Sequence, residues 1–269
     1  MAQAVFLTDM TWPEVKARLP KIRLAILPTG STEQHGPHLT VETDIAISTE
    51  LARRLAEQHA PHVVVAPPLP VGLSNHHMHF PGTITWSAGT FNACLSESIA
   101  ALAAHGIPRF LILNGHGGNR GALAVLCSQL RYWEDVQVAA CTWFELVRDA
   151  CQRFIPRRRV HADEIEVAMG LHLAPRIVRT AALARGRAHA DPHPCTDPGA
   201  GGGVEFPYFW EELTPNGAYG DARRATAEMG AELTAAFLER AGEFVTSFIR
   251  PEKSRRTRDL AARRSAIRH

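Results

Sequence analysis

The chain has 269 residues, of which 45% are hydrophobic and 21% charged, which excludes a disordered protein and suffices for a sizeable core. The formal net charge is only +2, and residues 250–269 alone contribute +6 through eight Lys or Arg and two Asp or Glu. The remainder carries about −4, which argues against nucleic-acid binding. We therefore expect one folded domain over 1–249 and a basic, mobile tail over 250–269.

The cysteines and the N-terminus indicate a cytoplasmic protein. Five cysteines are scattered without a CxxC spacing, at positions 94, 127, 141, 151 and 195. Such a set fits free thiols in a reducing compartment better than a disulfide framework. The N-terminus lacks the basic and apolar regions of a signal peptide, and no run is long and apolar enough to span a bilayer.

Strands alternate with helices along the chain. A capped helix starts at Thr11, and short apolar runs predict strands at 24–27, 63–66, 110–113 and 136–141. Helical periodicity predicts helices over 44–58, 87–105, 122–133, 161–173 and 225–249. This alternation predicts an α/β fold, a three-layer α/β/α sandwich with a mostly parallel sheet, and a ligand site beyond the carboxyl ends of its strands. Residues 188–203 read as a long loop. The apolar stripe of the last helix reads as core or subunit contact.

The first candidate site follows the strand at 24–27. Glu33, His35 and Asp44 lie within twelve residues, and in an extended segment Glu33 and His35 point to the same side. Two carboxylates and an imidazole suit a divalent metal. The alternative is a polar loop in which Asp44 caps the next helix.

The second candidate site is the run from Asn114 to Asn119, which follows the strand at 110–113 and reads Asn-Gly-His-Gly-Gly-Asn. Glycines at a strand-to-helix turn let the backbone approach a ligand, and the N–H groups of Gly117 and Gly118 suit an oxyanion. The alternative is a glycine-rich turn whose His116 has no special role. A phosphate loop is disfavoured because a Walker Lys-Ser/Thr pair is missing.

The third candidate site is His161 with Glu164 and Glu166. In the helix predicted over 161–173, residues 161 and 164 share a face, so we expect His161 to transfer a proton while Glu164 binds metal or orients the imidazole. The alternative is a helix N-terminus whose acidic residues are favoured by the dipole.

These stretches together resemble the creatininase (creatinine amidohydrolase) family. The resemblance covers roughly residues 20–248 and rests on five segments: 27–38 with Asp44, 79–83, 114–119, 161–166 and 219–226. It implies a three-layer α/β fold, a homo-oligomer, often a hexamer, and two divalent metal ions per subunit (zinc, manganese or iron(II)).

The resemblance also implies roles for individual residues. Glu33, His35, Asp44 and His116 match metal ligands, with Asp44 as the bridge, and His161 matches the catalytic histidine. Creatinine-hydrolysing enzymes carry a ligand glutamate where Gly118 stands. Many relatives with the Gly-Gly version instead have a glutamate three residues after the catalytic histidine, so the resemblance assigns the missing ligand to Glu164. Glu166 and Asn114 are then supporting residues. The family's Trp-Asp pair before the catalytic histidine is missing, which puts creatinine in doubt as the substrate.

The resulting hypothesis is a metal-dependent amidohydrolase that cleaves a C–N bond, other than a peptide bond, of a small cyclic amide or formamide. A metal-activated water attacks, and His161 protonates the leaving nitrogen. His76 and His77 line the substrate side, or else belong to a polar surface loop. One alternative is a non-catalytic metal-binding scaffold or maturation partner in a biosynthetic pathway. Another is a redox iron enzyme.

Overall fold

A computed structural model describes residues 4–134, 136–155, 161–190, 193, 196, 204 and 206–250. At its centre lies a parallel sheet of the strands β1 (Leu24–Thr29), β2 (Val63–Val65), β3 (Arg109–Asn114) and β4 (Gln137–Thr142). The strand order is β2-β1-β3-β4, and Ile26 of β1 pairs with Val65 on one side and Leu111 on the other. This arrangement confirms the predicted α/β class with a parallel sheet.

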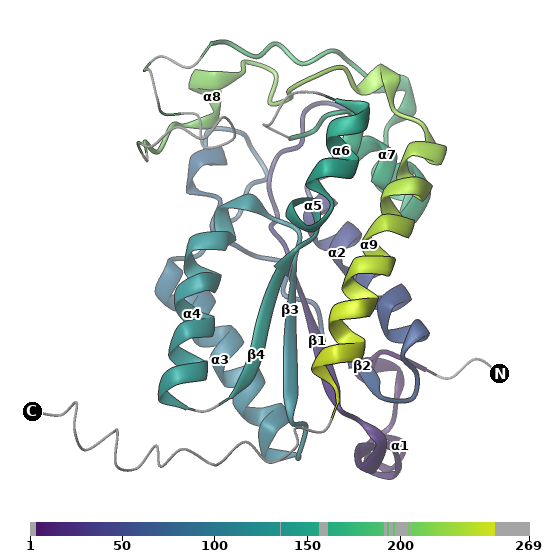
Figure 1. The fold of residues 1–269 in the computed structure, drawn as a ribbon. Coiled ribbons are helices and arrows are strands. Elements are labelled where there is room, and N and C mark those ends of the chain that lie inside the picture. Colours follow the sequence, from purple (N-terminus) through teal and green to yellow (C-terminus); the bar gives the residue numbers. More distant parts are fainter. Residues whose placement is uncertain are drawn as a thin grey trace, which may run out of the picture.

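Helices cover both faces of the sheet, with α3 and α4 on one face and α2 and α9 on the other (Figure 1). The α-helices are α1 (Trp12–Arg18), α2 (Thr43–Gln58), α3 (Ala88–Ala104), α4 (Arg120–Trp133), α5 (Trp143–Leu146), α6 (Arg148–Phe154), α7 (Glu164–Leu173), α8 (Trp210–Leu213) and α9 (Ala227–Phe248). Single 3-10 turns lie at Leu7–Asp9, Leu19–Lys21, Asn75–His77, Gly117–Asn119, Pro175–Ile177, Thr180–Ala182 and Ala222–Arg224.

The strands separate two hydrophobic cores because successive side chains point to opposite faces. Leu24 and Ile26 of β1 face the core that contains α2, α7 and α9. Ala25 and Leu27 face the core formed with α3 and α4. Each fully buried large apolar side chain contributes roughly 1.5–3 kcal/mol. The continuous apolar runs in the sequence therefore mark strands that are covered on both faces.

Most predicted elements appear within two residues of their expected bounds, but α7 differs. It begins at Glu164, with Asp163 as its N-cap, so His161 lies in the turn before the helix. At α2, Glu42 occupies the cap position and Asp44 is already inside the helix, so the capping role considered for Asp44 is wrong. Residues 251–269 and most of 191–205 lie outside the described part of the chain. Within the described residues, no helix has the length and apolar character of a membrane span.

Two glycines bring the strand-end turns against the start of α2. A Cβ atom on Gly115 would lie 2.3 Å from the carbonyl oxygen of Asp44, and one on Gly30 would lie 2.5 Å from the Ile45 nitrogen. Only glycine fits such close backbone approaches. The carboxyl ends of β1 and β3 are thereby held against Asp44.

Candidate metal centre and active site

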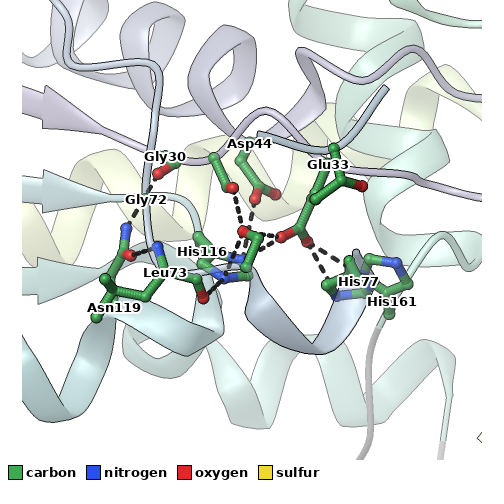
Figure 2. Close-up of polar contacts among 12 residues, drawn as sticks. Gly30, Glu33, Asp44, Gly72, Leu73, His77, His116, Asn119 and His161 are labelled. Atoms are coloured by element: carbon green, nitrogen blue, oxygen red, sulfur yellow. Dashed lines mark hydrogen bonds and ion pairs between the residues drawn. The ribbon is translucent and has the colours of Figure 1, made fainter. Parts of the chain in front are cut away.

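Six buried polar residues converge beyond the carboxyl ends of β1 and β3. They come from three segments that lie far apart in the sequence, and all are at most 6% exposed: Glu33, His35, Asp44, His116, His161 and Glu166. All of them except His116, together with His77, form overlapping clusters in which three ligand atoms lie within 4.8 Å of one another. Figure 2 shows His116 in contact with both Glu33 and Asp44, with His77 and His161 on the other side of Glu33. The structure therefore brings together residues from all three sequence motifs.

One half of the cluster surrounds His35. Its Nε2 atom lies 3.1 Å from Asp44 Oδ1, 3.7 Å from Glu166 Oε2 and 4.0 Å from Glu33 Oε1. Its Nδ1–H donates to the backbone carbonyl of Glu33 at 3.1 Å, because a carbonyl oxygen can only accept. The Nε2 atom of His35 is thereby directed at the carboxylates.

The other half of the cluster surrounds His116. Its Nδ1 atom lies 3.2 Å from Glu33 Oε2 and 3.2 Å from Asp44 Oδ2. Its Nε2–H donates to the carbonyl oxygen of Leu73 at 3.0 Å. Asp44 thus presents one carboxylate oxygen to each histidine, which is the arrangement expected of a carboxylate shared by two ions.

These donor groups fit divalent cations. Each histidine ties one ring nitrogen to a backbone carbonyl and presents the other to carboxylates, as metal-ligating histidines usually do. Among the described residues, Glu33 Oε1 and Asp44 Oδ2 are buried and make no hydrogen bond of good geometry. Buried carboxylates are costly without compensating charge, so carboxylates gathered around two oriented imidazoles favour a cation.

The pKa values of the cluster reflect this crowding. Burial would lower the pKa of His35, but Asp44, Glu166 and Glu33 together raise it to about 10. Burial and the neighbouring Asp44 raise the pKa of Glu166 to about 8, against the influence of His35. Burial opposes ionisation of Asp44, yet His35 and His116 hold its pKa well below the usual range. Without a cation, protons on the histidines and on Glu166 supply the compensating charge.

Glu166 lies at the cluster, where Glu164 was expected, and Glu164 lies elsewhere. Glu166 lines the same cavity as Glu33 and Asp44, whereas Glu164 lines a second cavity with Arg185, Gly186, Ala188, Gly220, Asp221 and Arg224. The expectation that Glu164 completes the ligand set is therefore not supported by the geometry. It assumed that His161 and Glu164 share a helical face, but the helix starts only at Glu164. Two helical positions separate side chains by about 200°, which directs Glu166 inward instead.

A strained turn delivers His161 to the cluster. Ala162 has a φ of 47°, a left-handed conformation that is unfavourable for alanine. Its N–H donates to Glu166 Oε2 at 2.5 Å, and its carbonyl accepts from His38 Nε2 at 2.8 Å. The side chains of Glu166 and His38 thereby stabilise the conformation that points His161 toward Glu33, at 3.9 Å from Nδ1 to Oε1.

Gln34 fixes which ring nitrogens of His77 and His161 carry protons. Its Oε1 accepts from the Gly36 N–H at 2.9 Å, which orients the amide. Its Nε2 lies 3.0 Å from His77 Nδ1, 2.9 Å from His161 Nε2 and 3.1 Å from the Gly217 carbonyl, but it has only two protons to donate. His161 Nε2 is also 3.0 Å from the Gln34 carbonyl. Because a carbonyl oxygen can only accept, His161 Nε2–H donates there, and Gln34 donates to His77 and Gly217 and makes no hydrogen bond to His161 Nε2.

This assignment leaves the Nδ1 lone pair of His161 facing the cluster. Burial, with His35 nearby, lowers the pKa of His161 well below its ordinary value, so the ring is neutral and can accept a proton there. His77 Nε2–H then points at Glu33 Oε1, 3.4 Å away. Sequence reasoning gave no role to Gln34, although it lies within the first motif.

A hydrogen-bonded frame holds the metal-binding groups in place. Ser74 Oγ donates to Glu33 Oε2 at 2.6 Å, a contact that sequence reasoning also missed. Asn114 accepts from the His116 N–H at 3.2 Å and donates to its carbonyl at 2.6 Å, as a supporting residue should. Asn119 donates to the Gly30 carbonyl and accepts from the Leu73 N–H, which links the turns after β1, β2 and β3 (Figure 2).

The cluster opens into a cavity of about 880 Å³ whose lining includes His76, His77, Gly117, Gly118 and Trp210. His76 and His77 therefore line the cavity and are not simply residues of a polar surface loop. A Cβ atom on Gly118 would lie 2.4 Å from both His116 Nε2 and the Leu73 carbonyl, so this turn has no room for a side chain. The Trp210 ring lies 4.7 Å, between centroids, from His77 and from His161. Trp210 was not anticipated, because no motif surrounds it.

The fold and the cluster together define a class of α/β protein with a buried group of histidines and carboxylates, of the kind that can hold a metal ion, beside an open cavity. Residues 8–245 match the sequence model of the Creatininase family, described as creatinine amidohydrolase. The chain belongs to this family, which confirms the resemblance read from its motifs.

Three of the relatives of this chain illustrate two of the activities for which such relatives are named. The chain is 34% identical to the "Mycofactocin precursor peptide peptidase" of Mycolicibacterium smegmatis over 61% of its length, spanning 64% of that protein. It is 33% identical to the protein of that name from Mycobacterium ulcerans, over 85% of this chain and 83% of the relative. The "Creatinine amidohydrolase" of Pseudomonas putida is 28% identical over 66% of this chain and 75% of the relative.

Solved creatininase structures share the fold. A mutant described as "Zn-Zn type" superposes with a TM-score of 0.76 at 24% identity, covering 93% of this chain and 100% of that one. A structure described as "Creatininase Mn" gives 0.77 at 24% identity with the same coverage. At this identity the likeness concerns the fold alone.

Proposed function

We propose that the protein is a metal-dependent amidohydrolase that cleaves a C–N bond at the cluster of Glu33, His35, Asp44, His116 and Glu166. The observation that carries the proposal is the position of Asp44, whose two oxygens each lie within 3.2 Å of a different histidine nitrogen. Each of these histidines is oriented by a backbone carbonyl. This pattern suits two neighbouring ions bridged by one carboxylate.

The donor atoms divide into two groups. Glu33, His116 and Asp44 Oδ2 would hold one divalent ion, and His35, Glu166 and Asp44 Oδ1 the other. Zinc, manganese and iron(II) all accept imidazole and carboxylate ligands. Such ions supply Lewis-acid polarisation of an amide carbonyl and lower the pKa of water toward neutrality.

His161 is the proposed proton carrier. Its Nδ1 atom carries the lone pair and faces the cluster, while Nε2–H is held by the Gln34 carbonyl. It accepts a proton as water attacks the amide carbon and donates this proton to the leaving nitrogen. The backbone at Gly117 and Gly118 lines the cavity without side chains and is positioned to stabilise a developing oxyanion.

The substrate class follows from the cavity and the relatives. The sequence hypothesis is a small cyclic amide or a formamide, whereas the relatives above 30% identity are named for a peptide substrate. The cavity, about 880 Å³ and open to solvent, has room for a short peptide as well as a small ring. We therefore propose a linear peptide-type amide first and include cyclic amides and formamides as the second group to test.

The experiment combines metal content with turnover. Protein purified without chelator should contain about two ions per chain, and Asp44→Ala should lose most of both, because its carboxylate serves both groups. Amine release should be screened under anaerobic conditions on short peptides, lactams and formamides. Normal metal content without turnover would support a scaffold, oxygen consumption would support a redox enzyme, and well-folded protein that binds no metal would overturn the proposal. The homo-oligomer, its hexameric order and the cytoplasmic location stay predictions.

A further inference from the structure

The outer wall of the catalytic cavity carries three charged side chains that the mechanism does not use. Arg120 at the start of α4, Glu145 in α5 and Arg148 at the start of α6 line the same cavity as Glu33 and Asp44. Arg120 Nη1 lies 3.1 Å from Glu145 Oε1, and Arg148 pairs with Glu145 Oε2. We call these three residues the arginine platform.

The charges of the platform do not cancel. One carboxylate is shared by two guanidinium groups, which leaves a net charge of +1 at the cavity wall. The arginine side chains are 53% and 48% exposed, so solvent or a ligand can reach them. Each guanidinium has five N–H donors in a fixed fork that matches a carboxylate, and Glu145 uses only part of this capacity.

The position of Arg120 is unusual for a residue that only stabilises the fold. It is the first residue of α4, where the positive end of the helix dipole disfavours a cation. The same dipole adds to the attraction for an anion in the cavity. Gly117, Gly118 and Gly121, which also line the cavity, leave the backbone near this helix end accessible. Two cations and a helix N-terminus therefore act on the same region of the cavity.

Apolar side chains also line the cavity beside the platform. Leu123, Ala140 and Phe144 line the same cavity as the platform and the metal-binding residues. A substrate that matches all three regions has an amide bond, an apolar body and an anionic group. The structure assigns to Arg120 and Arg148 the recognition of a substrate carboxylate, as found in an N-acyl amino acid or at the C-terminus of a peptide. This assignment rests on the proposed amidohydrolase function.

A purely structural reading is that Glu145 ties the start of α4 to α5 and α6. Under that reading, removing either arginine lowers the thermal stability and affects charged and neutral ligands equally. Under our proposal, the loss is confined to ligands that carry a carboxylate. The two readings therefore differ in ligand preference, which can be measured at equilibrium without turnover.

The probes are N-benzoylglycine and its neutral counterpart N-benzoylglycinamide, which share an amide bond and an aromatic body. Their dissociation constants would be measured by calorimetry on the metal-loaded protein and repeated after chelation, because ions can also attract a carboxylate. We expect the carboxylate probe to bind about tenfold more tightly in both forms. This preference should weaken as the salt concentration rises, because the arginines are exposed.

Arg120→Gln and Arg148→Gln should each reduce the preference about fivefold, and Glu145→Gln should increase it, because both guanidinium groups are released. Arg53→Gln is the matched control: Arg53 bridges Glu50 and Glu57 on α2 and is not part of the cavity lining. Equal binding of the two probes, a preference unchanged in both arginine variants, or no binding of N-benzoylglycine at millimolar concentration would overturn the assignment. Failure of metal binding or of amide hydrolysis would instead count against the proposed function.

Discussion

Glu164 and Glu166 stand two positions apart on α7, yet their side chains line different cavities. Glu166 Oε2 lies 3.7 Å from His35 Nε2 and also accepts the Ala162 N–H. It therefore contributes to the metal cluster and to the turn that presents His161. Glu164, equally buried, lies beside Arg185, Asp221 and Arg224.

Substitution of the two glutamates should separate these roles. We expect Glu166→Gln to lower kcat/KM at least about 100-fold and to weaken metal binding, because a ligand and the anchor of Ala162 are lost together. Glu164→Gln should keep its metal content and stay within about tenfold of wild type. Metal analysis and steady-state kinetics on the same preparations test this. Loss of metal in Glu164→Gln alone would restore the assignment made from the sequence.

Metal binding should tighten as the pH rises. In the metal-free protein the pKa of His35 is raised to about 10 and that of Glu166 to about 8, so both hold protons at neutral pH. A cation must displace these protons, and its apparent affinity therefore grows until both groups are deprotonated. Zinc titrations in buffers of different ionisation enthalpy would count the protons released. Glu166→Gln should release about one proton fewer, and a pH-independent affinity would contradict the predicted protonation.

The thermal stability of the metal-free protein should depend on pH through the protonation of the same two groups, His35 and Glu166. Because both pKa values are raised by folding, their contribution is present at acid pH and decreases as the pH rises through about 8 and then about 10. Tm of the chelated protein should therefore fall between about pH 7 and about pH 10, and fall less in Glu166→Gln. An equal fall of Tm in the wild type and in Glu166→Gln would show that the carboxyl group of Glu166 is already ionised when metal-free.

Gly115→Ala should damage the site from a distance. The new Cβ would meet the Asp44 carbonyl at 2.3 Å, so either the β3 turn or the start of α2 must move. We expect a loss of about 1–3 kcal/mol in the free energy of unfolding together with weaker metal binding. Gly89→Ala is the control, because its Cβ meets only Ser87 Oγ at 3.9 Å within α3 and alanine favours a helix. Unchanged metal content in Gly115→Ala would refute the role of this contact.

Gln34→Met should reduce kcat more than it raises KM. Methionine keeps the approximate volume but removes the amide that donates to His77 and Gly217 and accepts from Gly36. His161 then loses the Gln34 amide group that lies beside its ring, and we expect a decrease in kcat of about 10- to 100-fold. The pH profile of kcat should shift in this variant, whereas a defect limited to stability would leave its shape unchanged. Normal kcat would show that the Gln34 carbonyl alone suffices.

Local patterns in the sequence predicted the sheet and most of the candidate site. The apolar runs at 24–27 and 110–113 form β1 and β3, and their carboxyl ends place the first two motifs side by side. That step needs only the rule that ligands gather beyond the ends of parallel strands. Glu33, His35, Asp44 and His161 accordingly meet in overlapping clusters, and His116 lies 3.2 Å from both Glu33 and Asp44.

Features that depend on tertiary geometry could not be predicted. The exchange of Glu164 for Glu166 follows from the left-handed Ala162, which removes His161 from the helix, and no local pattern predicts that conformation. Trp210 contacts His77 and His161 only because a distant segment folds over the cavity. Ser74 was visible as a polar loop residue, but its hydrogen bond to Glu33 depends on how the turns after β1 and β2 meet.

The donor groups of the cluster come from positions 33 to 166, so cations held there would act as reversible cross-links between segments that an unfolded chain keeps far apart. Ligands that bind only the folded state stabilise it in proportion to the logarithm of their free concentration. The heat resistance of this protein should therefore follow the local cation supply. An environment with few free divalent cations would both inactivate the site and make the chain more susceptible to unfolding and proteolysis.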